Sequence, residues 1–160
     1  GRGASKHYPC MSVSEIEAFP IPRMAEDSLL FLWRVASMPD EALRVAHAWG
    51  FTPKSEIVWV KGSVRDGELV PRIGMGRYVR NSHESALICS RGRGHRVIRS
   101  HSVPSVIVAP RGRHSAKPDE FRRLVDSLAG GPVVELFART RWPGWDCLGN
   151  ELQCPTREVA

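Results

Sequence analysis

The run VVELFAR at residues 133–139 constrains the fold most, because its apolar residues bracket a single carboxylate. A continuous apolar run of this length is typical of a buried parallel strand. In open α/β sheets, an acid at the carboxyl end of such a strand binds the sugar of a nucleotide-like ligand, which makes Glu135 a candidate. Arg139, Asn150 and Glu151 follow on loops expected at the same sheet edge. The pattern therefore indicates a cofactor that contains a nucleoside.

Apolar runs alternate with stretches of helical periodicity along the rest of the chain. Pro39 and Pro118 are each followed by acids, a pattern that marks the first turn of a helix. The segment 62–81 contains Asp66-Gly67 and is predicted to be a long loop or hairpin, of a length that is uncommon unless it carries function. The expected strands are 29–33, 56–61, 85–90, 106–109 and 133–138. This alternation predicts a three-layer α/β sheet in one domain over residues 1–160.

Composition argues against several classes of protein. Hydrophobic content of 42% and charged content of 25% are ordinary for a globular domain. No apolar run approaches the roughly 18 residues of a membrane span, and the first residues lack the hydrophobic region of a secretion signal. The four cysteines form no CxxC pair, and the six histidines form no ligand pair at helical spacing. We therefore expect a cytoplasmic protein with reduced cysteines, no membrane span and no metal.

Positive charge is unevenly distributed. Lys and Arg total 23 against 17 acids, a net charge of +6, and the excess is concentrated in residues 72–80, 91–99 and 111–114. Arginines spaced by glycines, such as Arg91, Arg93 and Arg96, suit phosphate contacts, which favours sequence-independent binding of nucleic acid. The same charge would also fit solvated surface loops or an anionic small ligand.

Common catalytic motifs do not occur in the sequence. There is no GxxxxGK[ST] phosphate loop and no HExxH zinc motif. There is no GxSxG nucleophile elbow. The glycine pairs at 74/76 and 92/94 lack the third glycine and the strand–turn–helix context of a dinucleotide fingerprint. These absences leave the late strand and the basic stretches as the informative features.

Eight short segments follow one another in a distinctive order. They are HYPxMS at 7–12, LFLW at 30–33, WGF at 49–51, IVWVK at 57–61, RNxHE at 80–84, SxKPDE at 115–120, ELFAR at 135–139 and GNE at 149–151. Together they resemble the MTA-seventy family of adenine methyltransferases. That family includes the catalytic subunit of the eukaryotic mRNA adenosine methyltransferase and many bacterial and phage DNA enzymes. Each segment alone is a weak signal, but eight in register are highly specific.

The resemblance implies a Rossmann-like S-adenosylmethionine-dependent methyltransferase fold of permuted order, with the cofactor-binding strand late in the chain. Glu135 would accept hydrogen bonds from the ribose, Phe137 would lie beside the adenine, and Lys117 would hold the methionine carboxylate. An ammonium beside a helix N-terminus also suits a carboxylate on physical grounds. The cofactor-binding residues that the resemblance implies are Lys117, Glu135, Phe137, Arg139, Asn150 and Glu151.

The substrate implied by the resemblance is adenine in nucleic acid, methylated at its exocyclic amino group. Tyr8 and Glu84 would lie near the target base, and the basic stretch with Arg91, Arg93 and Arg96 would bind the backbone. The compact loops are more similar to the prokaryotic or phage branch, which favours DNA, although phosphate-binding arginines serve DNA and RNA alike. The sequence leaves open whether the protein is a monomer or a dimer.

The sequence departs from the family at one important place. The catalytic signature Asp-Pro-Pro-Trp does not occur, so no catalytic residue can be assigned in this chain. In relatives the signature lies shortly before the segment that matches residues 7–9. We favour an N-terminally incomplete methyltransferase domain. The alternatives are a non-catalytic nucleic-acid-binding subunit with a degenerate methyltransferase fold and, with less support, a nucleotide-binding regulatory domain.

Overall fold

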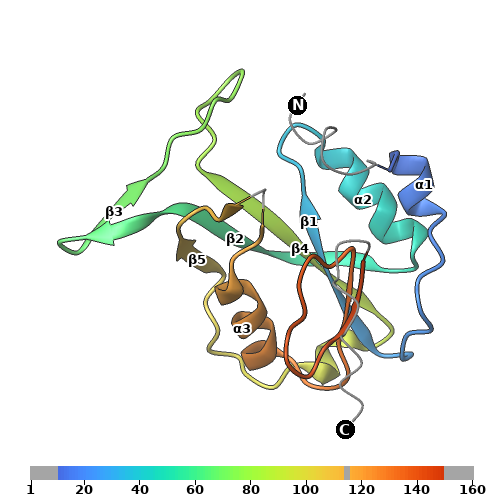
Figure 1. Cartoon of the computed structure of the whole chain (residues 1–160). Coiled ribbons are helices and arrows are strands. Elements are labelled where there is room, and N and C mark those ends of the chain that lie inside the picture. Colours follow the sequence, from blue (N-terminus) through green and yellow to red (C-terminus); the bar gives the residue numbers. More distant parts are fainter. Residues whose placement is uncertain (1–10, 114–115, 150–160) are drawn as a thin grey trace, which may run out of the picture.

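The computed structural model describes residues 11–113 and 116–149. Figure 1 shows a twisted central sheet with helices against it and a long hairpin that extends away from it. The helices are α1 (Val13–Glu17), α2 (Pro39–Ala48), the 3-10 helix η2 (Gly94–Val97) and α3 (Asp119–Leu128). The strands are β1 (Ser28–Arg34), β2 (Thr52–Arg65), β3 (Glu68–Pro71), β4 (His83–Arg91), β5 (Val106–Ala109), β6 (Val134–Leu136) and β7 (Asp146–Leu148). None of the helices in the described ranges is long and apolar enough to cross a membrane.

The main sheet is mixed, with β4 between β1 and β2. Its order is β1-β4-β2-β3, and β5 pairs with β2 in parallel. Both β1 and β2 run antiparallel to β4, so they are parallel to each other. An antiparallel β2–β4 pair is possible because the hairpin excursion, rather than a crossover helix, connects the two strands. The predicted α/β class is therefore confirmed, as a mixed and mostly antiparallel sheet.

Different helices cover the two faces of this sheet. Leu87 and Cys89 of β4 belong to a buried cluster that includes Ala46 of α2. Ala86, one residue before Leu87, belongs to a second cluster that includes Phe121 of α3. Because successive strand residues point to opposite faces, α2 and α3 lie on opposite sides of the sheet.

The segment predicted as a loop or hairpin is a hairpin formed by the long strand β2 and by β3 (Figure 1). Asp66 and Gly67 both have positive φ, 51° and 79°, as the two central residues of a type I′ turn require. Closer to the body of the protein, a Cβ on Gly62 would lie only 2.4 Å from the carbonyl oxygen of Val70. Glycine at this position therefore allows the two strands to approach closely at the base of the hairpin.

The late strand β6 differs from expectation in its length and in its partner. It pairs in parallel with β7 in a separate two-stranded sheet, and its residues are half-buried. The strand ends at Leu136, because the next residue, Phe137, has a φ of 57°, which is incompatible with extended backbone. The predicted strand 133–138 therefore exists, but with a shorter extended part and outside the main sheet.

Helix α1 was not predicted from the sequence, although a signal for it is present. Ser12 accepts a hydrogen bond from the Glu15 backbone, and the Glu15 side chain accepts one from the Ser12 backbone. This reciprocal pair is a capping box, which the S-x-x-E spacing at 12–15 could have indicated.

Helix α3 holds the loop between β6 and β7 through one carboxylate. Asp126 accepts hydrogen bonds from the indole N–H groups of Trp142, at 2.9 Å, and Trp145, at 2.7 Å. Each carboxylate oxygen takes one indole, so both acceptors are required. The contact fixes the C-terminal loop, and with it β6, against the helix.

Asp126→Asn should lower the free energy of unfolding by about 1 kcal/mol, because an amide offers only one oxygen to two indole donors. Urea denaturation followed by tryptophan fluorescence measures the change. Asp66→Asn is the matched control, since asparagine tolerates the left-handed backbone of that turn. Equal effects of the two substitutions would show that the indole contacts contribute nothing to stability.

Candidate functional site

Three charged side chains meet where β2, β4 and the start of α3 come together. Glu84 lies near the beginning of β4, Lys61 lies in β2, and Lys117 directly precedes Pro118, the N-cap residue of α3. Lys117 Nζ donates to Glu84 Oε1 at 2.5 Å, and Lys61 Nζ lies 2.7 Å from Glu84 Oε2. The structure thus joins one predicted cofactor-binding residue, Lys117, directly to one predicted substrate-binding residue, Glu84.

Each lysine of this cluster also lies over a tryptophan ring. Lys61 Nζ is 5.3 Å from the centroid of Trp59, and Lys117 Nζ is 4.9 Å from that of Trp33. Trp59 is almost fully buried and donates its indole N–H to the Ala109 carbonyl at 2.9 Å. Cation–π contacts of this kind stabilise an ammonium where water is partly excluded. The charged cluster therefore rests on the core of the sheet.

The electrostatics of Glu84 reflect two opposing effects. Partial burial raises the pKa of Glu84, and hydrogen bonds and charge from Lys117 and Lys61 lower it. The lysines prevail, so that the pKa lies below its ordinary value of 4.5. Glu84 is consequently a carboxylate at neutral pH, and the three side chains together carry one excess positive charge.

Glu135, the predicted ribose ligand, has a basic partner. Arg122 of α3 donates from Nε to Oε2 at 3.1 Å and from Nη2 to Oε1 at 2.9 Å, which makes a bidentate pair. The side chain of Arg122 is only 9% exposed and that of Glu135 is 26% exposed. The pair fixes the orientation of the carboxylate, and its outer lone pairs remain available as acceptors. It also ties β6 to the helix whose start carries Lys117.

Phe137 and Arg139 follow Glu135 on the same loop. Phe137 is 47% exposed and its ring contacts that of Phe19, with centroids 5.0 Å apart. Arg139 is half-buried and interacts with its surroundings. A Cβ on Gly149 would lie 2.1 Å from the Ala138 carbonyl, so Gly149 lies directly against this loop. Strand β6, which Arg122 ties to α3, and Gly149 are therefore close to this loop.

The basic stretch with Arg91, Arg93 and Arg96 lies elsewhere. Arg91 ends β4, seven residues from Glu84, which is about 23 Å along an extended strand. The Arg93 backbone N–H donates to Asp27 at 2.7 Å, and Arg96 lies 3.9 Å from the same carboxylate. The structure does not bring these arginines to the Glu84 cluster, and their role in nucleic-acid binding stays a prediction.

Three predicted site residues, Tyr8, Asn150 and Glu151, lie outside the described residues. Within residues 11–113 and 116–149, no group of three or more His, Cys, Asp or Glu side chains could hold a metal ion.

Comparison with known proteins identifies the family. The sequence matches the MT-A70 family model over residues 2–151. The chain belongs to the MT-A70 family. This is the MTA-seventy family indicated by the eight segments, so the resemblance drawn from the sequence is confirmed.

Relatives of this MT-A70 chain come from animals, plants and bacteria. It is 30% identical over 149 residues to an N(6)-adenosine-methyltransferase MT-A70-like protein of Drosophila melanogaster, covering 91% of the chain and 24% of that relative. It is 27% identical over 165 residues to the type II methyltransferase M.MunI of a Mycoplasma species, covering 96% and 66%. It is 26% identical over 160 residues to the human N(6)-adenine-specific methyltransferase METTL4, covering 92% and 34%. The chain thus spans from a quarter to two thirds of these relatives.

Two residues of the candidate site, Lys61 and Arg122, were missed in the sequence analysis. Lys61 closes the segment IVWVK and was quoted only as part of the family pattern. Arg122 lies inside α3, where an arginine next to a second arginine, Arg123, looks like part of a solvated face. The lysine was detectable as a charge at the end of an apolar run, whereas the Arg122–Glu135 pair depends on how the helix docks.

Glu84→Gln should lower the free energy of unfolding at pH 7 by about 1.5–3 kcal/mol, because both lysines lose an ionised partner. Since the folded pKa of Glu84 is depressed, its contribution is fully present above about pH 4.5 and is lost as the pH falls through the folded pKa. The difference between wild type and variant should therefore narrow in acid, as thermal melts at a series of pH values would measure. Glu56→Gln, which removes one carboxylate from an exposed pair with Arg34, is the control and should cost less than about 1 kcal/mol. A pH-independent difference for Glu84→Gln would contradict the account.

Proposed function

We propose that this chain binds S-adenosylmethionine and forms the cofactor- and substrate-facing part of an adenine methyltransferase that acts on nucleic acid, with DNA favoured. The observation that carries the proposal is that Lys117 directly precedes helix α3 and Glu135 is paired with Arg122 of the same helix, in a member of the MT-A70 family. Strands β1 and β2 are parallel to each other and flank the antiparallel strand β4. This arrangement fits a Rossmann-like methyltransferase sheet of permuted order, which we include in the proposal.

The chemistry of the described residues fits the cofactor. Lys117 provides an ammonium directly before the N-terminus of α3, where the ammonium and the positive end of the helix dipole both favour a carboxylate. Glu135 provides a fixed carboxylate with lone pairs to accept ribose hydroxyls. Phe137 has a half-exposed aromatic ring on the same loop, which suits stacking against adenine. When bound, S-adenosylmethionine supplies a methyl group already activated on its sulfonium, so that positioning of the acceptor accounts for much of the rate.

In this proposal the residues of the chain bind the cofactor and hold its contacting groups in position. Lys117 would share its ammonium between Glu84 and the cofactor carboxylate, because an ammonium has three donors. Glu84 fixes the position of that ammonium, and Arg122 does the equivalent for the Glu135 carboxylate. No described residue is proposed to move a proton.

Two considerations favour nucleic acid, and DNA within it. Relatives are named as adenine and adenosine methyltransferases and as a type II methyltransferase. Among those named above, M.MunI is the one of which the chain covers the largest share, 66%. The sequence-based similarity of the compact loops to the prokaryotic branch points the same way.

The alternative function is a non-catalytic nucleic-acid-binding subunit. The basic stretches of the chain would serve such a subunit as well as they would serve an enzyme. For the described residues we propose binding of the cofactor and of nucleic acid, and we assign none of them to the methyl-transfer step. A subunit that serves only as a platform would not bind the cofactor.

Lys117→Gln should weaken S-adenosylmethionine binding about 10- to 150-fold, the equivalent of one charge-assisted hydrogen bond of about 1.5–3 kcal/mol. Isothermal titration calorimetry of the wild-type chain and the variant measures the effect. Lys54→Gln removes the same charge from an exposed position and should leave the affinity unchanged.

The proposed site would be supported if the wild type releases or absorbs heat on binding S-adenosylmethionine and the affinity falls in Lys117→Gln but not in Lys54→Gln. Absence of binding by the folded wild-type chain would favour the platform subunit. Equal affinity for wild type and Lys117→Gln would place the cofactor elsewhere.

A further inference from the structure

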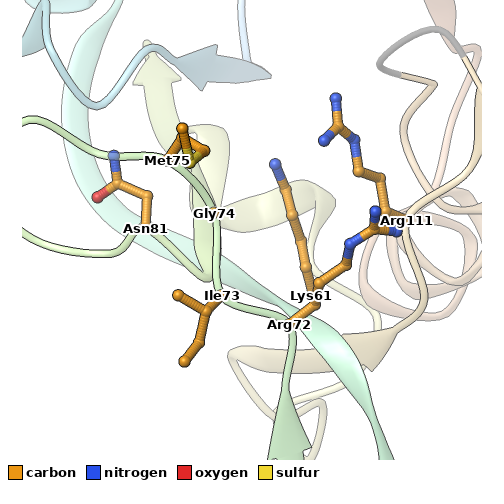
Figure 2. A pocket seen from close by; sticks show the side chains of 7 residues that line it. All are labelled: Lys61, Arg72, Ile73, Gly74, Met75, Asn81 and Arg111. Carbon is orange, nitrogen blue, oxygen red and sulfur yellow. The ribbon is translucent and has the colours of Figure 1, made fainter.

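A hollow of about 250 Å³ lies beside the Glu84 cluster, at the base of the β2–β3 hairpin. Figure 2 shows Lys61, Arg72 and Arg111 along one side of it and the loop residues Gly74 and Asn81 along the other. One water molecule needs only about 10–15 Å³ of such space. The hollow is therefore large enough for a hydrated phosphodiester group.

Backbone contacts hold these side chains in place. The Arg72 N–H donates to the Lys61 carbonyl at 2.6 Å, so the two cationic side chains leave neighbouring backbone positions, one in β2 and one directly after β3. The Gly74 N–H donates to the Asn81 carbonyl at 2.9 Å and closes the loop that forms the opposite wall. The shape of the hollow is therefore set by the hairpin base rather than by flexible side chains alone.

The charge of this hollow is positive and largely uncompensated. No acidic residue lines it, and among the described residues no ion pair involves Arg72 or Arg111. In the part of the chain that the structure describes, the one acidic partner of Lys61 is Glu84, which it shares with Lys117. Three cations at one opening attract an anion, and arginine forks match phosphate oxygens in particular.

A second hollow of about 360 Å³ adjoins the first. It shares Arg72 and Arg111 with the first hollow and adds Arg65 of β2, and it too is lined by no acidic residue. Two adjoining cationic hollows suit successive phosphates of one strand better than a single small anion. Because Lys61 contacts Glu84, the row of cations ends at the proposed site of the target base.

We propose that Lys61, Arg72 and Arg111 bind backbone phosphates of the nucleic-acid strand whose adenine is presented to the Glu84–Lys117 cluster. This inference rests on the proposed function, and it names the side from which the substrate strand approaches. It locates backbone binding at the hairpin base, at the opposite end of β4 from Arg91.

The test is the salt dependence of binding to a short fluorescein-labelled single-stranded DNA that contains adenine, measured by fluorescence anisotropy. Arg72→Gln/Arg111→Gln should weaken binding and reduce the slope of log K against log [NaCl] by about 1.4, since each phosphate contact on a single strand contributes about 0.7. Arg72→Lys/Arg111→Lys retains both charges and should keep most of the slope. Arg23→Gln/Lys54→Gln, which removes two exposed cations, should keep the wild-type slope.

Both arginines are exposed, so the double variant should keep the wild-type circular dichroism melt. Arg111→Gln alone should reduce the slope by about 0.7 and provides a second, milder test. The inference would be overturned if Arg72→Gln/Arg111→Gln and Arg111→Gln both kept the wild-type slope. An equal reduction of the slope in Arg23→Gln/Lys54→Gln would overturn it as well.

Calorimetry with S-adenosylmethionine on the same proteins separates this inference from the proposed function. Unchanged cofactor affinity in Arg72→Gln/Arg111→Gln, with a reduced slope, supports both. A reduced slope in a chain that binds no cofactor would support the phosphate site and contradict the cofactor proposal.

Discussion

The contact on which the site depends is the double ion pair of Glu84 with Lys61 and Lys117. One carboxylate joins two strands of the main sheet to the start of α3, and each lysine rests on a tryptophan of the core. Taking these charges out of water is unfavourable, and the short hydrogen bonds and aromatic faces offset it. Because one negative charge meets two positive ones, the cluster keeps an excess positive charge that an anionic ligand can satisfy.

Around this cluster the molecule has two differently built sides. Toward α3, the Arg122–Glu135 pair and the indole contacts of Asp126 fix the late loop on a single helix, so the groups suited to a cofactor are held rigidly. Toward the hairpin, Arg72 and Arg111 are exposed and unpaired with acids among the described residues. The rigid side suits a small ligand with several different groups, and the cationic side suits a repeating phosphate backbone.

The local elements were predictable because their signals are local. Proline and acids at helix starts, the Asp-Gly turn and continuous apolar runs predicted α2, α3, the hairpin and the strands β1, β4 and β5. The strand order was not predictable, because pairing of β4 with both β1 and β2 depends on contacts distant in sequence. For the same reason the sequence indicated Lys117 and Glu84 separately but neither their contact nor the Arg122–Glu135 pair. The family resemblance suggested the roles proposed for these residues, and the fold shows their partners.

The most direct test of this account, in which Lys117 faces the cofactor and Lys61 faces the phosphate backbone, is the ¹⁵N–¹H NMR spectrum of the lysine ammonium groups. Lys61→Arg and Lys117→Arg assign the resonances. If the cluster separates two ligands, S-adenosylmethionine should shift the Lys117 ammonium resonance most and adenine-containing single-stranded DNA the Lys61 resonance most. Shifts of neither lysine by either ligand, or an identical response of both to DNA alone, would contradict the account.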